Sequence, residues 1–497
     1  MNRTTLLIFL FSYFACQTVF PQKAGDRPNV LFIFVDDLRP ELGCYGNKLI
    51  RTPNLDRLAA QSFVFRNHYV HVPTCGASRF SLLTGMLPRT RAHLRNDAIA
   101  RFISPEPEGD RPESFIHHLR RNGYHTVGIG KISHSAEGLL YPYTGNPKGA
   151  KRELPHSFDE LLFDSAKWGT GWNAFFGYAD GSNRQRMQGQ VKPYEKGEVG
   201  DEGYPDGISA TLAVDKIKQL SKSETPFFLG VGFFKPHLPF TSPQKYWDLY
   251  EESDLPLTPS PDLPEHANAA GFHNSNEFNA YKSGEEHPSL SEPVSDGYAR
   301  KIMHAYYAAV SFVDAQIGKV LQALQDSGIA ENTIVVVWGD HGWHLGDHRV
   351  WGKHTLSERA LRSPLIIKVP RTQNGGRTFT QVVSTVDIYP TLMDLCNISM
   401  EYTTDGRSLS EVLNNAKTRS RRNVAYGYFN NGITMRSERF RLTRYFRSQE
   451  PVVELYDHNK DPHENHNVAA DRQATVKKLM RLLEKGNTGL YRVNEGG

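Results

Sequence analysis

Three uninterrupted apolar segments, each followed closely by charged residues, constrain the fold of this 497-residue chain more than any other feature. They are Val30–Val35, Pro226–Gly232 and Thr333–Trp338. Apolar runs without alternation are typical of strands buried on both faces, as in parallel sheets covered by helices. We therefore predict an α/β fold with a large, mostly parallel sheet, and a ligand site beyond the carboxyl ends of its strands.

Helical and irregular segments connect these strands. Apolar residues three or four apart from Ile302 to Leu324 predict an amphipathic helix that packs on the sheet. Ser114–Asn122, stopped by Gly123, predicts a shorter helix. Residues 253–295 are rich in Pro, Ser, Glu and Asn, which indicates a long surface excursion of the kind that is often functional or disordered.

The pattern changes near residue 415. Short alternating segments at Ile433–Tyr445 and Val452–Tyr456 predict a small antiparallel sheet, and Val476–Leu483 predicts a closing helix. We expect a main domain over residues 25–415 and a smaller C-terminal α+β subdomain with an antiparallel sheet over residues 416–497.

The first 22 residues predict a signal peptide, because Arg3 precedes a short apolar core at Leu6–Phe14. That core is too short to cross a bilayer and no later segment is apolar for long enough, so we expect no transmembrane segment. Ala15-Cys16 leaves lipid anchoring through Cys16 as an alternative, which the bulky Tyr13 disfavours. We expect a periplasmic or secreted protein.

Charge and cysteine content narrow the function further. The formal net charge is only +4 and the chain has no polybasic block, so nucleic acid is a poor candidate partner. Four cysteines in an exported chain of this size do not make a disulfide framework.

Acidic residues follow two of the predicted strands. Asp36 and Asp37 come directly after the first apolar segment, and Asp340 and His341 follow the third. Adjacent acids at the end of a buried strand must be paired or bind metal, and hydrogen-bonded acids at an ordinary strand end are the alternative. The recurrence after a second strand favours a divalent cation, and carboxylate ligands favour Ca²⁺ or Mg²⁺ over zinc.

Basic residues also gather near strand ends. The set is Arg79, Lys131, His134, His237, Lys353 and His354. Fixed cations stabilise a transferring group that carries anionic oxygens, and an imidazole can protonate a departing alkoxide. For any single lysine, an ordinary surface cation is the simpler interpretation, but the set as a whole points to an anionic substrate.

A single cysteine stands at the start of an apolar, helix-like segment, in Cys75-Gly76-Ala77-Ser78-Arg79. A buried structural thiol is the usual interpretation of a free cysteine. This stretch, however, resembles the modification signature of type I sulfatases, in which the cysteine is oxidised to formylglycine (3-oxoalanine). The family pattern carries proline where this chain has Ala77.

The resemblance extends over nearly the whole chain beyond the leader. Shared elements include Thr52–Asp56, Leu83–Gly85, Gly130-Lys131, Asp340–Gly342, Thr385–Leu392 and Glu454–Asp457. Within the family, Asp36–Pro40, Lys235–Phe240 and Asp340–Trp343 make the chain most similar to iduronate-2-sulfatases and their bacterial relatives. The resemblance implies an alkaline-phosphatase-like core, with residues 25–415 as the catalytic sulfatase domain.

The resemblance also implies site roles. One Ca²⁺ is bound by Asp36, Asp37, Asp340 and His341 together with an oxygen of the modified Cys75. The formylglycine hydrate at Cys75 is the nucleophile, and one hydroxyl attacks sulfur while loss of the second proton later expels sulfate. Arg79 and Lys131 hold the hydrate and the metal site, and His134 hydrogen-bonds the second hydroxyl. Lys353 and His237 contact the sulfate and the bridging oxygen, with His237 as the proton donor.

Substrate and partners follow less directly. His93, Arg95, Trp343 and His344 are candidate substrate contacts, and ordinary loop residues are the alternative for each. We expect a sulfated oligosaccharide or polysaccharide, such as 2-O-sulfated uronate in glycosaminoglycan or a marine polysaccharide such as ulvan. A formylglycine-generating or anaerobic sulfatase-maturing enzyme is the implied partner. A phosphonate or phosphodiester hydrolase, a choline-sulfatase-like enzyme and a non-catalytic carbohydrate-binding relative remain alternatives.

Overall fold

The computed structural model describes residues 27–104, 113–372, 375–414, 424–446 and 452–491. The predicted signal peptide and Cys16 lie outside these residues. Within them, Cys44, Cys75 and Cys396 are free cysteines.

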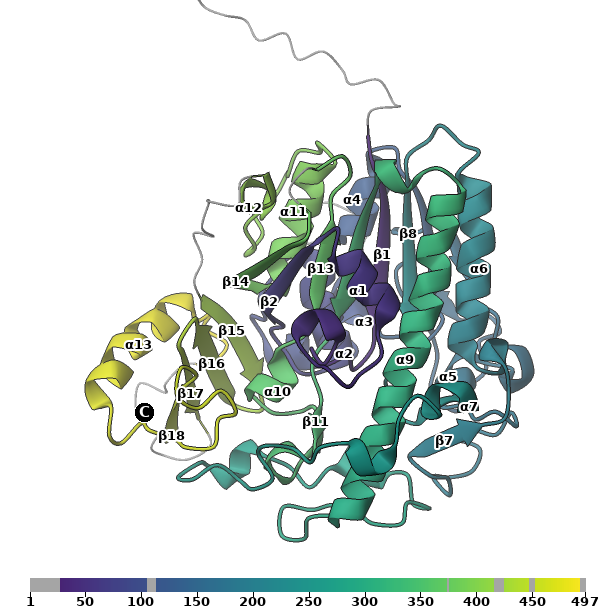
Figure 1. Ribbon diagram of the computed structural model, residues 1–497. Helices are drawn as coiled ribbons and strands as arrows, with labels where there is room; N and C mark the ends of the chain where they lie inside the picture. The colour runs from purple at the N-terminus through teal and green to yellow at the C-terminus, as the bar shows by residue number, and fades with distance from the viewer. Residues whose placement is uncertain (1–26, 105–112, 373–374, 415–423, 447–451, 492–497) are drawn as a thin grey trace, which may run out of the picture.

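An eight-stranded sheet forms the centre of the molecule (Figure 1). The three predicted strands lie side by side in it, with β1 hydrogen-bonded in parallel to β10 on one side and to β8 on the other. Only β13 runs antiparallel to its neighbours. In spatial order the strands are β14 (Arg377–Ser384), β2 (Phe63–Tyr69), β13 (Leu365–Lys368), β10 (Thr333–Gly339), β1 (Asn29–Val35), β8 (Phe227–Phe233), β3 (His125–Gly130) and β6 (Glu160–Leu162).

Helices cover both faces of this sheet, which explains why its central strands are apolar without alternation. Leu31, Ile33 and Val35 of β1 belong to one apolar cluster, and Val30 and Phe32 belong to another. The first cluster joins α1 (Pro53–Ala59), α6 (Pro205–Leu220) and α9 (Asp296–Asp326); the second joins α2 (Cys75–Thr84), α4 (Phe115–Arg121) and α11 (Ile388–Leu395).

The predicted helices are present with extended or shifted ends. The long helix α9 begins at Asp296, earlier than the apolar pattern indicated, because Ser295 caps it by accepting a hydrogen bond from the Tyr298 amide. The shorter helix α4 starts after Ser114, and Gly123 follows it with a φ of 86°. Among the residues that the structure describes, no helix has the length and apolar character needed to cross a membrane.

The C-terminal part forms a separate four-stranded antiparallel sheet, coloured yellow-green in Figure 1. The segment predicted at Ile433–Tyr445 is a hairpin of two strands, and one further strand precedes it that the sequence did not indicate. The elements are β15 (Val424–Phe429), β16 (Gly432–Ser437), β17 (Phe440–Tyr445), β18 (Val452–Asp457) and α13 (Gln473–Gly486).

A buried ionic network joins this sheet to the main domain. Arg441 of β17 pairs with both Glu358 and Glu464 and donates to the Leu356 carbonyl at 3.3 Å. Glu358 begins α10 (Glu358–Leu361), and its amide donates to Glu464 at 2.8 Å. The network therefore fixes the chain segment that follows Lys353, from Leu356 to Glu358.

The excursion over residues 253–295 is ordered and packs onto the main domain. Its short helix α8 (Asn276–Asn279) lies against β12 (Trp351–Gly352). The remaining short elements are α3 (Ala98–Phe102), α5 (Gly171–Phe175), α7 (Gln244–Trp247), α12 (Ser410–Asn414), β4 (Leu139–Leu140), β5 (Lys151–Arg152), β7 (Tyr194–Gly197), β9 (Phe240–Pro243) and β11 (His344–Leu345).

Candidate active site

Three carboxylates meet at the carboxyl ends of β1 and β10. Asp36 and Asp37 follow β1, Asp340 follows β10, and all three are fully buried. One oxygen from each lies within 4.8 Å of the other two. The Asp37 amide donates to Asp340 Oδ1 at 2.9 Å, and Asp37 itself has a φ of 57°, a strained backbone conformation that is frequent at functional sites.

The three acids differ in their pKa values. Burial raises the pKa values of Asp37 and Asp340 to about 7, and the charge of Asp36 contributes to both increases. Burial acts in the same direction on Asp36, but Lys131 and Arg79 hold its pKa well below the ordinary value. Three carboxylates gathered this closely form a set of oxygen donors that suits a divalent cation.

Cys75 is the first residue of α2 and lies beside this cluster. Its Sγ is 3.3 Å from His341 Nε2, and His341 Nε2 is 3.4 Å from Asp37 Oδ1. Burial, assisted by the negative charge of Asp36, raises the pKa of the Cys75 thiol well above its ordinary value. Because the thiolate is the reactive form, an unmodified Cys75 would be a poor nucleophile.

Two buried cations hold the helix of Cys75 to the strand ends. Arg79, fully buried, contacts Asp340 Oδ2 at 3.1 Å and Asp36 Oδ1 at 3.2 Å. It also donates to the carbonyl oxygens of Lys131 and Ile132. Lys131 Nζ lies 2.5 Å from Asp36 Oδ2. These ion pairs bring together the segments after β1, β3 and β10.

Lys353 and His237 approach the acids from the other side. Lys353 Nζ is 3.0 Å from Asp37 Oδ1, and His237 Nε2 is 3.8 Å from Asp37 Oδ2. Burial lowers the pKa of His237 to about 4, and the positive charge of Lys353 acts in the same direction. The structure therefore places both residues of this predicted pair beside Asp37.

Glu277 is a member of the site that the sequence did not single out. Its Oε1 lies 3.1 Å from His237 Nε2 and 3.1 Å from Lys353 Nζ. It comes from α8 in the 253–295 excursion, where no periodic pattern marks it. The sequence indicated only that long loops of this kind often contain functional residues.

His134 lies at the edge of the cluster rather than in it. Its Nε2 is 3.4 Å from the Tyr143 hydroxyl, and its ring centroid is 5.5 Å from that of Trp172. Its Nδ1 is buried with no hydrogen-bond partner among the described residues. Burial and the charge of Lys131 lower its pKa well below the ordinary value, so the ring is neutral.

Of the four predicted substrate contacts, Trp343 lies beside the cluster, with Lys353 Nζ 5.2 Å from its ring centroid. Trp343 and His344 are fully buried, and His344 is hydrogen-bonded to Thr355 and Ser357, so neither has a free face for a sugar. His93 packs between aromatic rings, and the exposed Arg95 is paired with Asp97 at 3.2 Å. The core encloses Trp343 and His344, and a role for either in substrate binding stays a prediction.

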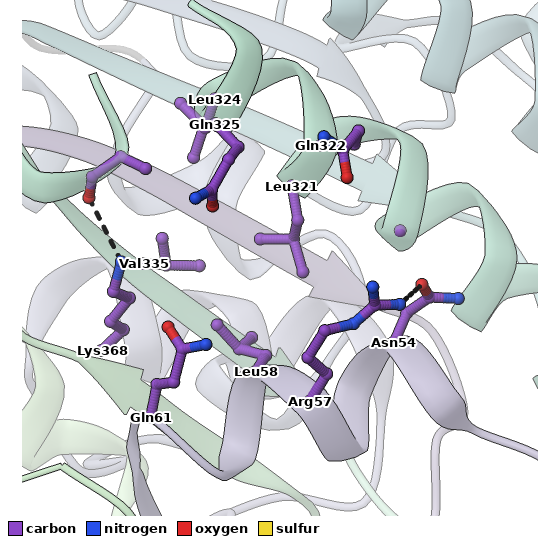
Figure 2. A pocket seen from close by; sticks show the side chains of 12 residues that line it. Asn54, Arg57, Leu58, Gln61, Leu321, Gln322, Leu324, Gln325, Val335 and Lys368 are labelled. Carbon is purple, nitrogen blue, oxygen red and sulfur yellow. Dashed lines mark hydrogen bonds between the residues drawn. The ribbon is translucent and has the colours of Figure 1, made fainter. Parts of the chain in front are cut away.

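A pocket of about 390 Å³ lies elsewhere, between α1, the end of α9 and the early part of β10 (Figure 2). Figure 2 shows Arg57 hydrogen-bonded to Asn54 along its wall. It contains none of the residues of the carboxylate cluster. Its position toward the opposite end of β10 separates it from the chemistry.

Together, a buried acidic cluster, a central cysteine and a surrounding set of cations define a hydrolase built for an anionic ester. The chain belongs to the sulfatase family, whose sequence model matches residues 28–398. It is therefore a sulfatase, an enzyme that hydrolyses sulfate esters. A second model, described as the C-terminal part of N-sulphoglucosamine sulphohydrolase, matches residues 346–488.

Comparison with individual proteins also identifies the chain as a sulfatase. Iduronate 2-sulfatase of Mus musculus is 31% identical over 409 residues, which cover 76% of this chain and 70% of that protein. A sulfatase of Formosa agariphila is 30% identical over 482 residues, covering 94% and 88%. The crystal structure of a phosphonate monoester hydrolase of Agrobacterium radiobacter superposes with a TM-score of 0.73 at 23% identity, covering 92% and 95%, which is a likeness of fold. The predicted family and α/β fold are confirmed.

Proposed function

We propose that this sulfatase uses formylglycine derived from Cys75 as its nucleophile and binds one Ca²⁺. The observation that carries the proposal is the position of Cys75 Sγ, 3.3 Å from His341 Nε2 and in a common group with Asp37. The high pKa of the thiol supports it, because a protonated cysteine at this position has little reactivity of its own.

The cation would be held by Asp36, Asp37, Asp340 and His341, together with the modified Cys75. The donor set is dominated by carboxylate oxygens, which suits a hard cation such as Ca²⁺, with Mg²⁺ as the alternative. When bound, such an ion would polarise an oxygen of the reacting sulfate ester and offset the charge of the buried acids.

The basic residues divide the remaining work. Lys353, buried beside Asp37, would bind the sulfate oxygens. His237 would donate a proton to the leaving oxygen from its protonated form, which the contact with Glu277 favours. The ring of His237 is fixed by its Nδ1, 2.7 Å from the Leu238 carbonyl, which leaves Nε2 facing the site. His134, neutral in the structure, would accept the proton from the second hydroxyl of the hydrated aldehyde. Arg79 and Lys131 would hold the reacting side chain and the acids in register.

For the substrate we propose a sulfated saccharide, with 2-O-sulfated iduronate or a comparable uronate in an oligosaccharide as the first candidate. The likeness to iduronate 2-sulfatase of Mus musculus supports this choice. Arg95 and His93 remain candidate contacts near the start of α3, with Arg95 the cation suited to a uronate carboxylate. We further propose that the protein is exported, on the leader-like first 22 residues.

The test combines chemistry at Cys75 with a substrate panel. The enzyme is produced together with a sulfatase-maturing enzyme, and the Cys75 peptide is examined by mass spectrometry for conversion of thiol to aldehyde. Desulfation is then measured on defined sulfated oligosaccharides, an aryl sulfate, an aryl phosphodiester and choline sulfate.

Conversion of Cys75 and turnover of a sulfated saccharide, both lost in Cys75→Ala, are the expected results. Preferred turnover of the phosphodiester or of choline sulfate would replace the proposed substrate by one of those classes. Full activity of Cys75→Ala would exclude the proposed nucleophile.

A further inference from the structure

The two carboxylate oxygens of Glu277 have different surroundings. Oε1 contacts Lys353 Nζ and His237 Nε2, each at 3.1 Å. Oε2 is buried and has no hydrogen-bond partner among the described residues. The side chain as a whole is 22% exposed, so Glu277 stands at the margin between the buried cluster and the solvent side. An unpartnered buried acceptor in such a place is suited to a donor brought in by a ligand.

The position of Glu277 is fixed by packing. Phe278, the next residue, is 2% exposed, and its ring centroid is 5.7 Å from that of Trp351. Ser275 accepts a hydrogen bond from the Trp351 amide at 2.9 Å and holds a φ of 52° to begin α8. A strained residue kept in place by such contacts indicates a required geometry. The carboxylate is thus a fixed part of the site.

Its neighbours define where it stands relative to a bound ester. Lys353 and His237 are the residues proposed to contact the sulfate and the bridging oxygen. With those roles, a carboxylate that contacts both would lie close to the carbon that bears the sulfate. The charge of Lys353 also offsets that of Glu277, so Glu277 does not simply repel the sulfate.

We propose that Glu277 Oε2 accepts a hydrogen bond from a substrate hydroxyl on the carbon adjacent to the sulfate ester. The inference rests on the proposed function and deepens it. It makes Glu277 a specificity residue that favours saccharide sulfates with a neighbouring hydroxyl over aryl sulfates, which bring no donor. A site built to bond a hydroxyl discriminates strongly against analogues that lack it, because its own buried acceptor is then left unpaired.

The experiment compares the loss of kcat/KM on a substrate that carries the neighbouring hydroxyl with the loss on substrates that lack it. Values of kcat/KM are measured for wild type, Glu277→Ala and Glu277→Gln on 2-O-sulfated iduronate, on its 3-deoxy analogue and on 4-nitrophenyl sulfate. If the panel above selects another saccharide, that saccharide and its analogue deoxygenated next to the sulfate replace the first two. Glu292→Gln removes an exposed carboxylate from the same excursion and serves as the matched control.

Glu277→Ala should lower kcat/KM on the hydroxylated saccharide about 10- to 100-fold more than on the deoxy analogue or the aryl sulfate. Glu277→Gln should show a smaller difference, and Glu292→Gln none. Thermal unfolding of each variant separates a folding defect from a site effect, since only a site effect depends on the substrate hydroxyl.

Equal losses on all three substrates would overturn the inference, because Glu277 would then act only through His237 and Lys353. A gain of activity in Glu277→Ala would overturn it as well, because the carboxylate would then be an obstacle. If wild type with converted Cys75 turns over no sulfate ester, the proposed function itself fails and the inference fails with it.

Discussion

Replacing Arg441 by methionine should destabilise the protein strongly at neutral pH. Arg441 is 1% exposed and pairs with Glu358 and Glu464, so its removal takes the main partner from Glu464 and one of two arginine partners from Glu358, which keeps Arg436. Breaking a buried ion pair from one side typically costs about 3–5 kcal/mol. Methionine keeps the apolar stem, so the loss reports mainly on charge.

The pKa of Glu464 gives a second route to the magnitude. Burial alone would raise it, but Arg441 and His458 hold the pKa at about 2, against an ordinary value of 4.5. A carboxyl with this difference between folded and unfolded chain contributes about 3 kcal/mol of stability at pH 7. Because the folded pKa is the lower one, this contribution is complete above about pH 4.5 and is lost as the pH falls toward 2.

Urea unfolding of wild type and Arg441→Met at pH 7 and pH 3 measures both effects. We expect a loss of about 3–5 kcal/mol at pH 7, and at pH 3 the share due to Glu464 should shrink to about 1.4 kcal/mol. The matched control is Arg444→Met on the same strand, whose partner Glu484 is 58% exposed and whose loss should stay below about 1 kcal/mol. A loss in Arg441→Met no larger than in the control, or one that grows as the pH falls, would refute the reasoning.

Two further predictions concern the site and the helix of Cys75. Removing divalent cations with a chelator should abolish sulfatase activity and lower the unfolding temperature. Adding Ca²⁺ should restore both, with about 2.7 kcal/mol of stabilisation at a Ca²⁺ concentration one hundred times its Kd. An unchanged unfolding temperature would contradict a cation at the three buried acids. Gly76→Ala should destabilise the protein by about 1–3 kcal/mol, because its Cβ would lie 2.2 Å from the Asn96 carbonyl oxygen, whereas Gly297→Ala in α9 meets no atom within 4 Å and should be neutral or stabilising. Equal unfolding free energies for the two alanine variants would contradict the steric argument.

The sequence was most informative where burial left a continuous pattern. β1, β8 and β10 are buried at every position because helices cover both faces, and their apolar runs predicted a shared edge for Asp36, Asp340 and His237. The strands β13 and β2 were not anticipated. β13 has only four residues, too few for a period, and the burial of β2 is interrupted at two positions.

Glu277 illustrates what a sequence pattern does not contain. It belongs to a four-residue helix set by Ser275 in a left-handed conformation and by packing on Trp351. Neither condition is visible in a polar segment read on its own. By contrast, Arg79 was predicted with Cys75 because both belong to the short stretch that resembles the family's modification signature. Their joint position follows from the four-residue spacing on α2.

The burial of Cys75 determines whether its modification would come before or after folding. The residue is 4% exposed and its helix is tied down through Arg79 to two strands that are far apart in the chain. A maturing enzyme that must bind the Cys75–Arg79 segment would therefore have access to this segment only before these strands assemble. If Cys75 is converted as proposed, conversion would take place on the nascent or newly delivered chain, and a molecule that folds first would keep its thiol.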